Sequence, residues 1–345
     1  MQIDDILLLR MNRQYLFAPA KDEFTVLRGL CGLQAQFYGN CLHALRLRCG
    51  KAPDEDILRT SAVKTWTLRG TLHLIAQSDL PIFLYDGRSH FLRPCDTMSD
   101  DGRLSAARKR ELAAIILDAA QKGCGGREEL RLLCRGHGMT DDEEQSAFDP
   151  WGGLLRALCE SGTLCHTAQQ KKAFRPCPPF APMTKADALR TLMRQYLTHY
   201  GPVTVQDAAY FFGLPQRELL PLIKSLSPRE FVCEGKIFYR LDDINIIGDL
   251  SCCRFLAGFD PLMLGYEKRA NPFLPEDALR SVFTLSGIVR PAILLDGKIV
   301  GIWKRRGKAV ELTGLIPLQP LQRSRIEQEA DRLWNGSFHR LVWTA

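Results

Sequence analysis

Two glutamines, Gln34 and Gln36, stand out by type and spacing in a largely apolar stretch. Each amide offers a carbonyl acceptor and an NH2 donor, so a pair can position a water molecule and stabilise positive charge, although an amide is a weak base. The residues from Phe24 through Leu30 to Phe37 suggest a helix. Residues two apart do not share a helix face, so a helix end or turn must aim both amides at one site. Glutamines that merely bond backbone or solvent are the commoner alternative.

Basic side chains recur near the ends of predicted hairpins, and they are a second set that could bind a ligand. These cations are Arg69, Lys171, Lys172, Lys304, Arg305, Arg306 and Lys308. A single basic tip is usually just solvated, but repetition at several hairpins favours contact with phosphates. The chain has 46 Lys and Arg against 39 Asp and Glu, a formal charge of +7, which agrees with a polyanionic partner.

The elements that must position these residues follow a repeated order of three helices and a hairpin. In one copy, apolar residues at helical spacing over 111–121 are followed by a short helix near Arg127, a helix through Leu154 and Leu158, and a hairpin over 163–175. The next copy follows the proline-rich joint 176–182. Its helices and hairpin are expected around 189–200, 204–212, 215–223 and 231–241.

The chain begins with a less regular copy of this order, and the end of the chain consists mainly of predicted strands. The first copy has expected helices at 4–16, 22–37 and 40–48 and a hairpin at 66–75. Beyond residue 250, Asp296-Gly297 predicts a tight hairpin between 292–295 and 298–303, and further strand character follows over 304–313. A helix over 323–334 and a strand over 341–343 complete a small β-rich domain. The order in each copy is typical of a winged helix.

Composition excludes several classes of protein. The values of 46% hydrophobic and 25% charged residues are those of a globular protein. The first 20 residues carry four charges and lack the apolar core of a secretory signal, and no run is long enough to span a membrane. The twelve cysteines are scattered without a Cys-x-x-Cys motif, so we expect cytosolic thiols. We expect no metal ligand set and no cofactor.

Four motifs resemble the winged-helix DNA glycosylases of the AlkZ and YcaQ kind, over nearly the whole chain. They are Gly32-Leu33-Gln34-Ala35-Gln36, the Trp66–His73 run WTLRGTLH, Phe259-Asp260-Pro261 followed by Arg269, and a C-terminal hairpin with Gly301 and Trp303. The resemblance implies an α+β fold of three tandem winged-helix motifs forming a curved basic cleft, with a C-terminal β-rich domain. The expected boundaries are 1–100, 101–180, 181–250 and 251–345.

The resemblance also implies a reaction and a site. Gln34 and Gln36 match a catalytic Gln-x-Gln pair, found in the branch that unhooks crosslinks made by bulky natural products. A Gln-x-Asp pair marks the other branch. The expected activity is hydrolysis of the N-glycosidic bond of cationic N7-alkylated purines, whose bases leave without protonation. The expected DNA contacts are Trp66, Arg69, His73, Lys171, Lys172, Lys304, Arg305 and Arg306. For Asp260, a residue before proline, a turn-forming structural role is expected.

Two alternatives remain from sequence. A non-enzymatic winged-helix transcriptional regulator would dimerise on a symmetric operator, whereas a glycosylase acts as a monomer on one lesion in double-stranded DNA. A metal-dependent nuclease has little support, because no His, Asp and Glu cluster has ligand spacing. We expect a monomer in the cytoplasm, associated with the nucleoid.

Overall fold

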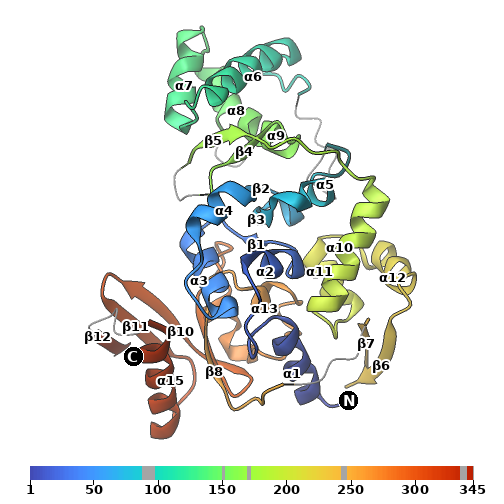
Figure 1. Ribbon diagram of the computed structural model, residues 1–345, viewed down its shortest axis with the longest axis vertical. Helices are drawn as coiled ribbons and strands as arrows, with labels where there is room; N and C mark the ends of the chain where they lie inside the picture. Colours follow the sequence, from blue (N-terminus) through green and yellow to red (C-terminus); the bar gives the residue numbers. More distant parts are fainter. Residues whose placement is uncertain (88–97, 150–151, 169–171, 242–246, 335–339, 345) are drawn as a thin grey trace. The chain divides into compact units, whose positions relative to one another are not determined.

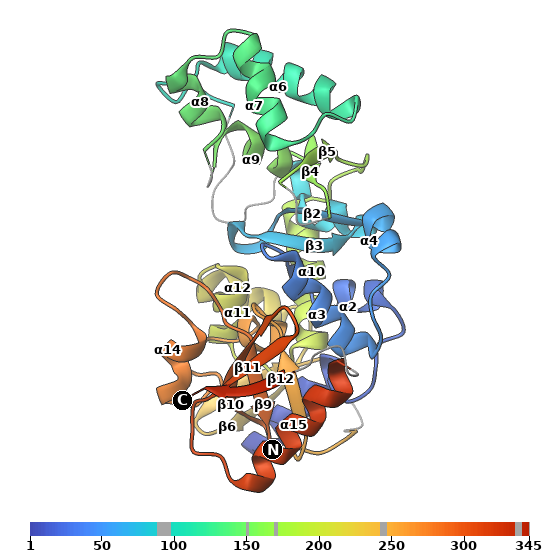
Figure 2. The same cartoon turned by 90° about the vertical axis from the view of Figure 1, so that its left-hand side faces the viewer.

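The computed structural model describes residues 1–87, 98–149, 152–168, 172–241, 247–334 and 340–344 (Figures 1 and 2). It divides into two compact units. The first unit combines residues 1–33, 39–53 and 193–345, and the second combines 34–38 and 54–192. The predicted first domain, 1–100, therefore contributes to both units. The division into four domains stays a prediction.

The second unit contains a five-stranded sheet and a group of helices. The sheet has the order β1-β3-β2-β4-β5. Its strands are β1 (Leu33–Gln34), β2 (Ala62–Trp66), β3 (Leu72–Ala76), β4 (Leu164–His166) and β5 (Phe174–Pro176). The strands β2 and β3 pair antiparallel from Ala62 opposite Ala76 to Trp66 opposite Leu72, which confirms the predicted hairpin. The helices are α4 (Glu55–Ser61), α5 (Leu80–Phe83), α6 (Ala106–Gln121), α7 (Arg127–Gly136), α8 (Asp141–Ala147) and α9 (Gly153–Glu160).

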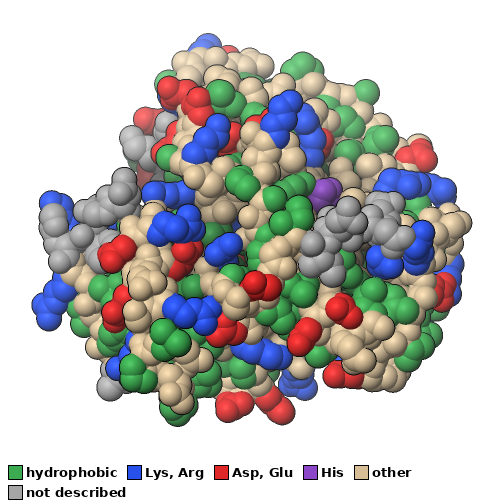
Figure 3. All heavy atoms as spheres, turned by 60° about the horizontal axis from the view of Figure 1, so that its bottom comes forward, with side chains coloured by type: hydrophobic (Ala, Val, Ile, Leu, Met, Phe, Trp, Pro, Cys, Tyr) green, Lys and Arg blue, Asp and Glu red, His purple; other side chains and the backbone are tan. Residues whose placement is uncertain are grey.

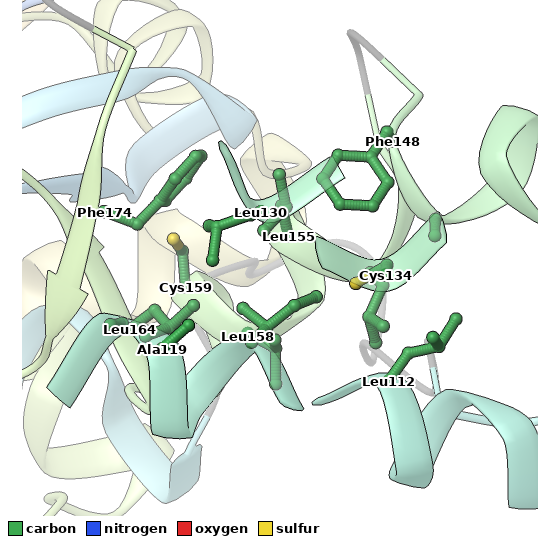
Figure 4. Close-up of a cluster of buried hydrophobic side chains, with 14 of the residues drawn as sticks. Leu112, Ala119, Leu130, Cys134, Phe148, Leu155, Leu158, Cys159, Leu164 and Phe174 are labelled. Atoms are coloured by element: carbon green, nitrogen blue, oxygen red, sulfur yellow. The ribbon is translucent and has the colours of Figure 1, made fainter. Parts of the chain in front are cut away.

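The apolar faces of α6, α7 and α9 form one core with strands β4 and β5. Leu112 of α6, Cys134 of α7 and Leu158 of α9 lie in the same buried cluster, together with Leu164 and Phe174 of the hairpin (Figure 4). Helix α8 lies where the sequence suggested only a polar, acidic stretch. Thr140 caps it, in a reciprocal capping box with Glu143, and this signal was present in the sequence.

The first unit begins with α1 (Ile3–Arg13), α2 (Glu23–Gly29) and α3 (Tyr38–Cys49). The expected third copy of the repeat is confirmed as an element order. It consists of α10 (Lys185–His199), which spans the boundary of the units, then α11 (Val205–Phe212), α12 (Gln216–Lys224), β6 (Arg229–Cys233) and β7 (Lys236–Arg240). Thr204 and Asp207 form the predicted cap of α11, with reciprocal hydrogen bonds of 3.0 Å. The winged-helix character of the three copies stays a prediction.

A second five-stranded sheet ends the chain, with the order β12-β11-β10-β9-β8. Its strands are β8 (Cys253–Leu256), β9 (Ala292–Leu295), β10 (Lys298–Arg306), β11 (Ala309–Gly314) and β12 (Arg340–Thr344). Two short helices, α13 (Pro261–Leu264) and α14 (Leu279–Val282), connect β8 to β9, and α15 (Pro320–Trp334) precedes β12. Residues of α15, among them Ile326 and Ala330, share a buried core with the sheet. The predicted β-rich segment is therefore present, and Asp296 and Gly297 form its tight turn with φ of 52° and 75°.

Candidate active site

The two glutamines lie in an extended segment, and the helix predicted over 22–37 is wrong in its second half. Helix α2 ends at Gly29, and the backbone then turns through Cys31 and Gly32, both with positive φ. The strand β1 is Leu33–Gln34, and a bend at Gln36 leads into α3. A glycine at position 32 relieves the strain that a side chain would have at φ 77°. The sequence analysis expected a helix end or a turn before the two glutamines, and the turn at Cys31 and Gly32 lies there.

Burial alternates along this segment as it does along a strand. Leu33 and Ala35 are buried, whereas Gln34 is half-buried and Gln36 is exposed. The N–H of Ala35 donates to the carbonyl of Leu72 in β3 at 2.8 Å, which fixes the backbone between the two amides. Gln34 therefore lies at the end of the paired strand, and Gln36 lies at the bend that precedes α3. The segment that carries the two amides is not helical.

The hairpin β2–β3 gives its three predicted DNA-contact residues different environments. Arg69 is half-buried in the turn, with a left-handed φ of 58°. The Trp66 ring is half-buried, lies 4.7 Å from the His166 ring and packs against the core of the second unit. These contacts support a packing role for Trp66.

His73 is enclosed in this hairpin. Its imidazole is 3% exposed, and Nδ1 lies 2.9 Å from the Thr67 hydroxyl and 3.1 Å from the Thr71 carbonyl. Burial, followed by the positive charge of Arg69, lowers its pKa to about 3. The imidazole is therefore neutral at pH 7 and ties the two ends of the turn together. A group so enclosed has a structural role here and offers no charge to a phosphate.

Apart from half-buried Arg69, the predicted basic tips are exposed where the structure describes them. Lys171 lies outside the described residues, and Lys172 is exposed. On the C-terminal hairpin Lys304, Arg305 and Arg306 are exposed at the end of β10. Glu311 of β11 lies 2.8 Å from the Lys304 ammonium and 3.6 Å from the Arg306 guanidinium. Part of the positive charge at this tip is therefore balanced inside the protein.

Sequence analysis missed a buried ion pair that anchors α3. Arg48, near the end of α3, donates two hydrogen bonds of 3.0 and 2.8 Å to the carboxylate of Asp260, and both side chains are 0% exposed. Asp260 also accepts the backbone N–H of Leu262 at 2.9 Å and caps α13. The structural role expected for Asp260 is confirmed, but its partner is over two hundred residues away. The one hint of such a pair was an arginine on the buried side of an expected helix, close to Ala44 and Leu45.

The described residues contain no group of three or more His, Cys, Asp or Glu arranged to hold a metal ion. All eleven cysteines in the described ranges are free thiols. None of the described helices combines the length and the apolar character needed to cross a bilayer. The groups that residues 34–36 offer for chemistry are two neutral amides, one at the end of β1 and one at the bend before α3.

Comparisons with known proteins show what the whole chain is similar to. The Streptomyces sahachiroi DNA glycosylase AlkZ, a solved structure, has the same fold, with a TM-score of 0.79 and 23% identity over 100% of this chain and 99% of that chain. An interstrand DNA cross-link repair glycosylase of Streptomyces sahachiroi is 27% identical over 356 residues, which cover 95% of this chain and 94% of the relative. A family model described as DNA glycosylase AlkZ-like matches residues 27–335.

These findings define the class: the chain is a DNA glycosylase. More particularly, it belongs to the AlkZ-like DNA glycosylase family, because the family model spans most of its length. Membership favours the enzyme over the alternative of a non-enzymatic regulator.

Proposed function

We propose that the protein hydrolyses the N-glycosidic bond of cationic N7-alkylated purines in double-stranded DNA, and that its substrates include interstrand crosslinks. The observation that carries the proposal is a pair of neutral amides, half-buried Gln34 and exposed Gln36, on a non-helical segment that the hydrogen bond from Ala35 to Leu72 holds against β3. The relative that is named as a cross-link repair glycosylase supports the second part.

Neutral side chains suit this substrate. An N7-alkylated purine already carries a positive charge, so the base is a good leaving group and does not have to be protonated by an acid. As the bond breaks, positive charge develops on the sugar, and an amide oxygen directed at that charge lowers the energy of the transition state. We therefore assign Gln34 and Gln36 to this catalytic role.

The amides have a second task, which is to position the attacking water. A glutamine oxygen accepts a hydrogen bond from water and fixes its direction, but it does not remove the proton with the strength of a carboxylate. Excision therefore depends on the leaving base. Neutral adducts, whose bases leave poorly, should be poor substrates.

Contacts to the DNA backbone are assigned to exposed cations. Lys172 at one hairpin and Lys304, Arg305 and Arg306 at another are exposed and can displace counterions from phosphates. Arg69, half-buried at a turn, is a weaker member of this set. Trp66 is assigned to packing, with any role in DNA contact secondary.

The experiment compares two substrates in the same assay. The protein is incubated with duplex DNA carrying N7-methylguanine and, separately, with duplex carrying a crosslink between two N7-guanines, and abasic sites are quantified. We expect abasic sites from both and a separation of the crosslinked strands. Release of methylguanine without strand separation would confine the activity to monoadducts, and no release from either duplex would contradict the proposal.

A further inference from the structure

Two cysteines face each other across the hairpin β4–β5, and the proposed reaction uses neither of them. Cys165 is the middle residue of β4, and Cys177 directly follows the last residue of β5. The ladder places Cys165 opposite Arg175, and the N–H of Cys177 donates to the Thr163 carbonyl at 3.0 Å. Cys177 therefore lies diagonally across the ladder from Cys165, and the pairing of the strands holds the two residues as neighbours.

The side chains of the two cysteines are in direct contact. The Cys177 thiol donates a hydrogen bond to the Cys165 sulfur. The Cys165 sulfur also lies 3.9 Å from the Pro176 carbonyl oxygen. Both residues are free thiols in this structure. Because the register already brings the sulfurs together, an S–S bond requires rotation of the side chains and no change in the pairing of the strands.

The surroundings of the pair favour a thiolate, which is the reactive form of cysteine. The hydrogen bond from Cys177, followed by the charge of the Arg175 guanidinium, lowers the pKa of the Cys165 thiol in spite of its burial. The same hydrogen bond, together with burial, raises the pKa of Cys177. The two sulfurs thus share one proton along their hydrogen bond. Movement of that proton to Cys165 leaves the thiolate on Cys177.

An oxidant reaches the pair through Cys177. This side chain is half-buried, whereas Cys165 is 0% exposed. A third cysteine, Cys159 of α9, lies close to Cys165 but packs among the apolar side chains of the core (Figure 4). Burial raises the pKa of Cys159 well above its usual value, so this thiol stays protonated and unreactive. Cys165 is therefore the partner that can react with an oxidised Cys177.

We propose that Cys165 and Cys177 form a peroxide-sensitive pair that closes reversibly to a disulfide across the hairpin β4–β5. First, the Cys177 thiolate attacks one oxygen of hydrogen peroxide, so that the O–O bond breaks, hydroxide leaves and the sulfur becomes a sulfenic acid. The Cys165 thiolate then attacks that sulfur, the S–S bond forms, the S–O bond breaks and a second hydroxide leaves. The two sulfurs lose two electrons and the peroxide gains them. The two thiol protons convert the two hydroxides to water.

The position of the pair suits a reversible bond. The sheet has the order β1-β3-β2-β4-β5, so β5 is its last strand and the disulfide would fix this edge of the sheet covalently. Disulfides that form transiently in a reducing compartment usually respond to oxidants, whereas structural disulfides belong to oxidising compartments. The contact of two free thiols therefore fits a redox-responsive site better than a permanent crosslink.

The first measurement counts thiols. Reduced full-length protein is treated with hydrogen peroxide and denatured, and the remaining thiols are blocked with N-ethylmaleimide and counted by mass spectrometry. We expect the wild type to lose two thiols per chain and to regain both with dithiothreitol. Cys177→Ser should lose no such recoverable pair, whereas the matched control Cys124→Ser, which removes an exposed cysteine elsewhere, should behave as the wild type. A wild-type protein that keeps all its thiols, or an equal loss in Cys177→Ser, would overturn the proposal.

The second measurement locates the bond in the oxidised wild-type protein, so it depends on no variant. Sequencing of the linked proteolytic peptides should show one bond that joins Cys165 to Cys177. A bond from Cys177 to Cys159, a bond between the adjacent Cys252 and Cys253, or a bond between two chains would contradict the assignment. Thiols that dithiothreitol does not restore would contradict it as well. Neither measurement uses DNA, so their outcome is independent of whether the protein releases N7-methylguanine.

Discussion

At the scale of single residues, the pair of Arg48 and Asp260 shows how two segments that are distant in the chain are held together. The carboxylate caps α13 and accepts two hydrogen bonds from Arg48 of α3, with no exposure of either side chain. The pair therefore anchors the end of α3 to α13, and this gives Asp260 of the motif Phe259-Asp260-Pro261 a structural role.

Asp260→Asn should destabilise the fold strongly. Breaking a buried pair by removing one partner leaves an unpaired charge and costs about 3–5 kcal/mol. The matched control is Arg332→Gln, which breaks an exposed pair with Glu329 and should cost about 1 kcal/mol or less. Urea denaturation measures both variants. Equal stabilities for the two would show that Arg48 and Asp260 do not anchor the fold.

Two buried histidines should make stability depend on pH below neutrality. Burial lowers the pKa of His73 and of His166 to about 3, from an ordinary value of 6.5. Between these values the unfolded chain binds protons that the folded protein does not, so the free energy of unfolding falls as pH falls from 6.5 toward 3 and is insensitive to these groups above 6.5. Denaturation midpoints across this range check the prediction. An imidazole signal of either residue that titrates near pH 6.5 in the folded protein would contradict it.

At the scale of elements, the hairpin β10–β11 combines cations with one internal carboxylate. The side chains of Lys304 and Arg306 both lie within ion-pair distance of Glu311, and the Lys304 ammonium lowers the pKa of that carboxyl. The same cations are assigned to phosphates. Glu311 therefore competes with DNA phosphates for Lys304 and Arg306.

Glu311→Gln should tighten binding to undamaged duplex. The change removes a negative charge and releases Lys304 and Arg306 for phosphates, so affinity should rise several-fold at low salt and less at high salt, where charges are screened. Asp331→Asn, an exposed carboxylate of α15, is the control for net charge. Binding titrations of the two variants and of the wild-type protein check the prediction. An affinity of Glu311→Gln that is equal to or weaker than that of the wild type would argue against DNA contact by this hairpin.

Local signals predicted many of the elements, and non-local pairing decided the rest. The cap formed by Thr204 and Asp207 and the turn at Asp296-Gly297 depend on neighbouring residues, so the pattern alone located them. The Gln34–Gln36 segment is held by a hydrogen bond to Leu72, far away in sequence, and its apolar neighbours satisfied helical spacing equally well. Of the candidate site, the residue types could be predicted, whereas the strand end and the bend that carry them could not.

At the scale of the whole molecule, the net charge is +7. On the face shown in Figure 3, basic and acidic side chains are interspersed. Each unit is built from segments that are distant in sequence, and the chain passes between the two units several times. The proposed DNA contacts likewise come from separate elements, with Lys172 just before β5 and Lys304, Arg305 and Arg306 at the end of β10.

The whole protein should bind undamaged duplexes of unrelated sequence with similar affinity and with a steep dependence on salt. Several separate cations each displace a counterion, and phosphates carry no sequence information. Competition between a palindromic and a random duplex, repeated at several salt concentrations, measures both properties. A strong preference for one palindrome, or a flat response to salt, would favour a sequence-specific regulator.

The most direct measurement of the central claim is single-turnover excision of N7-methylguanine by Gln34→Ala and Gln36→Ala. Removing one group that stabilises the transition state costs about 2.7–4 kcal/mol, a hundred- to a thousand-fold in rate, while affinity for undamaged DNA depends on cations elsewhere. Gln322→Ala, in α15, is the matched control and should excise at the wild-type rate. We predict that each active-site variant loses about this much rate and keeps wild-type stability and DNA affinity. Excision at the wild-type rate by both variants would contradict the assignment of catalysis to these two amides.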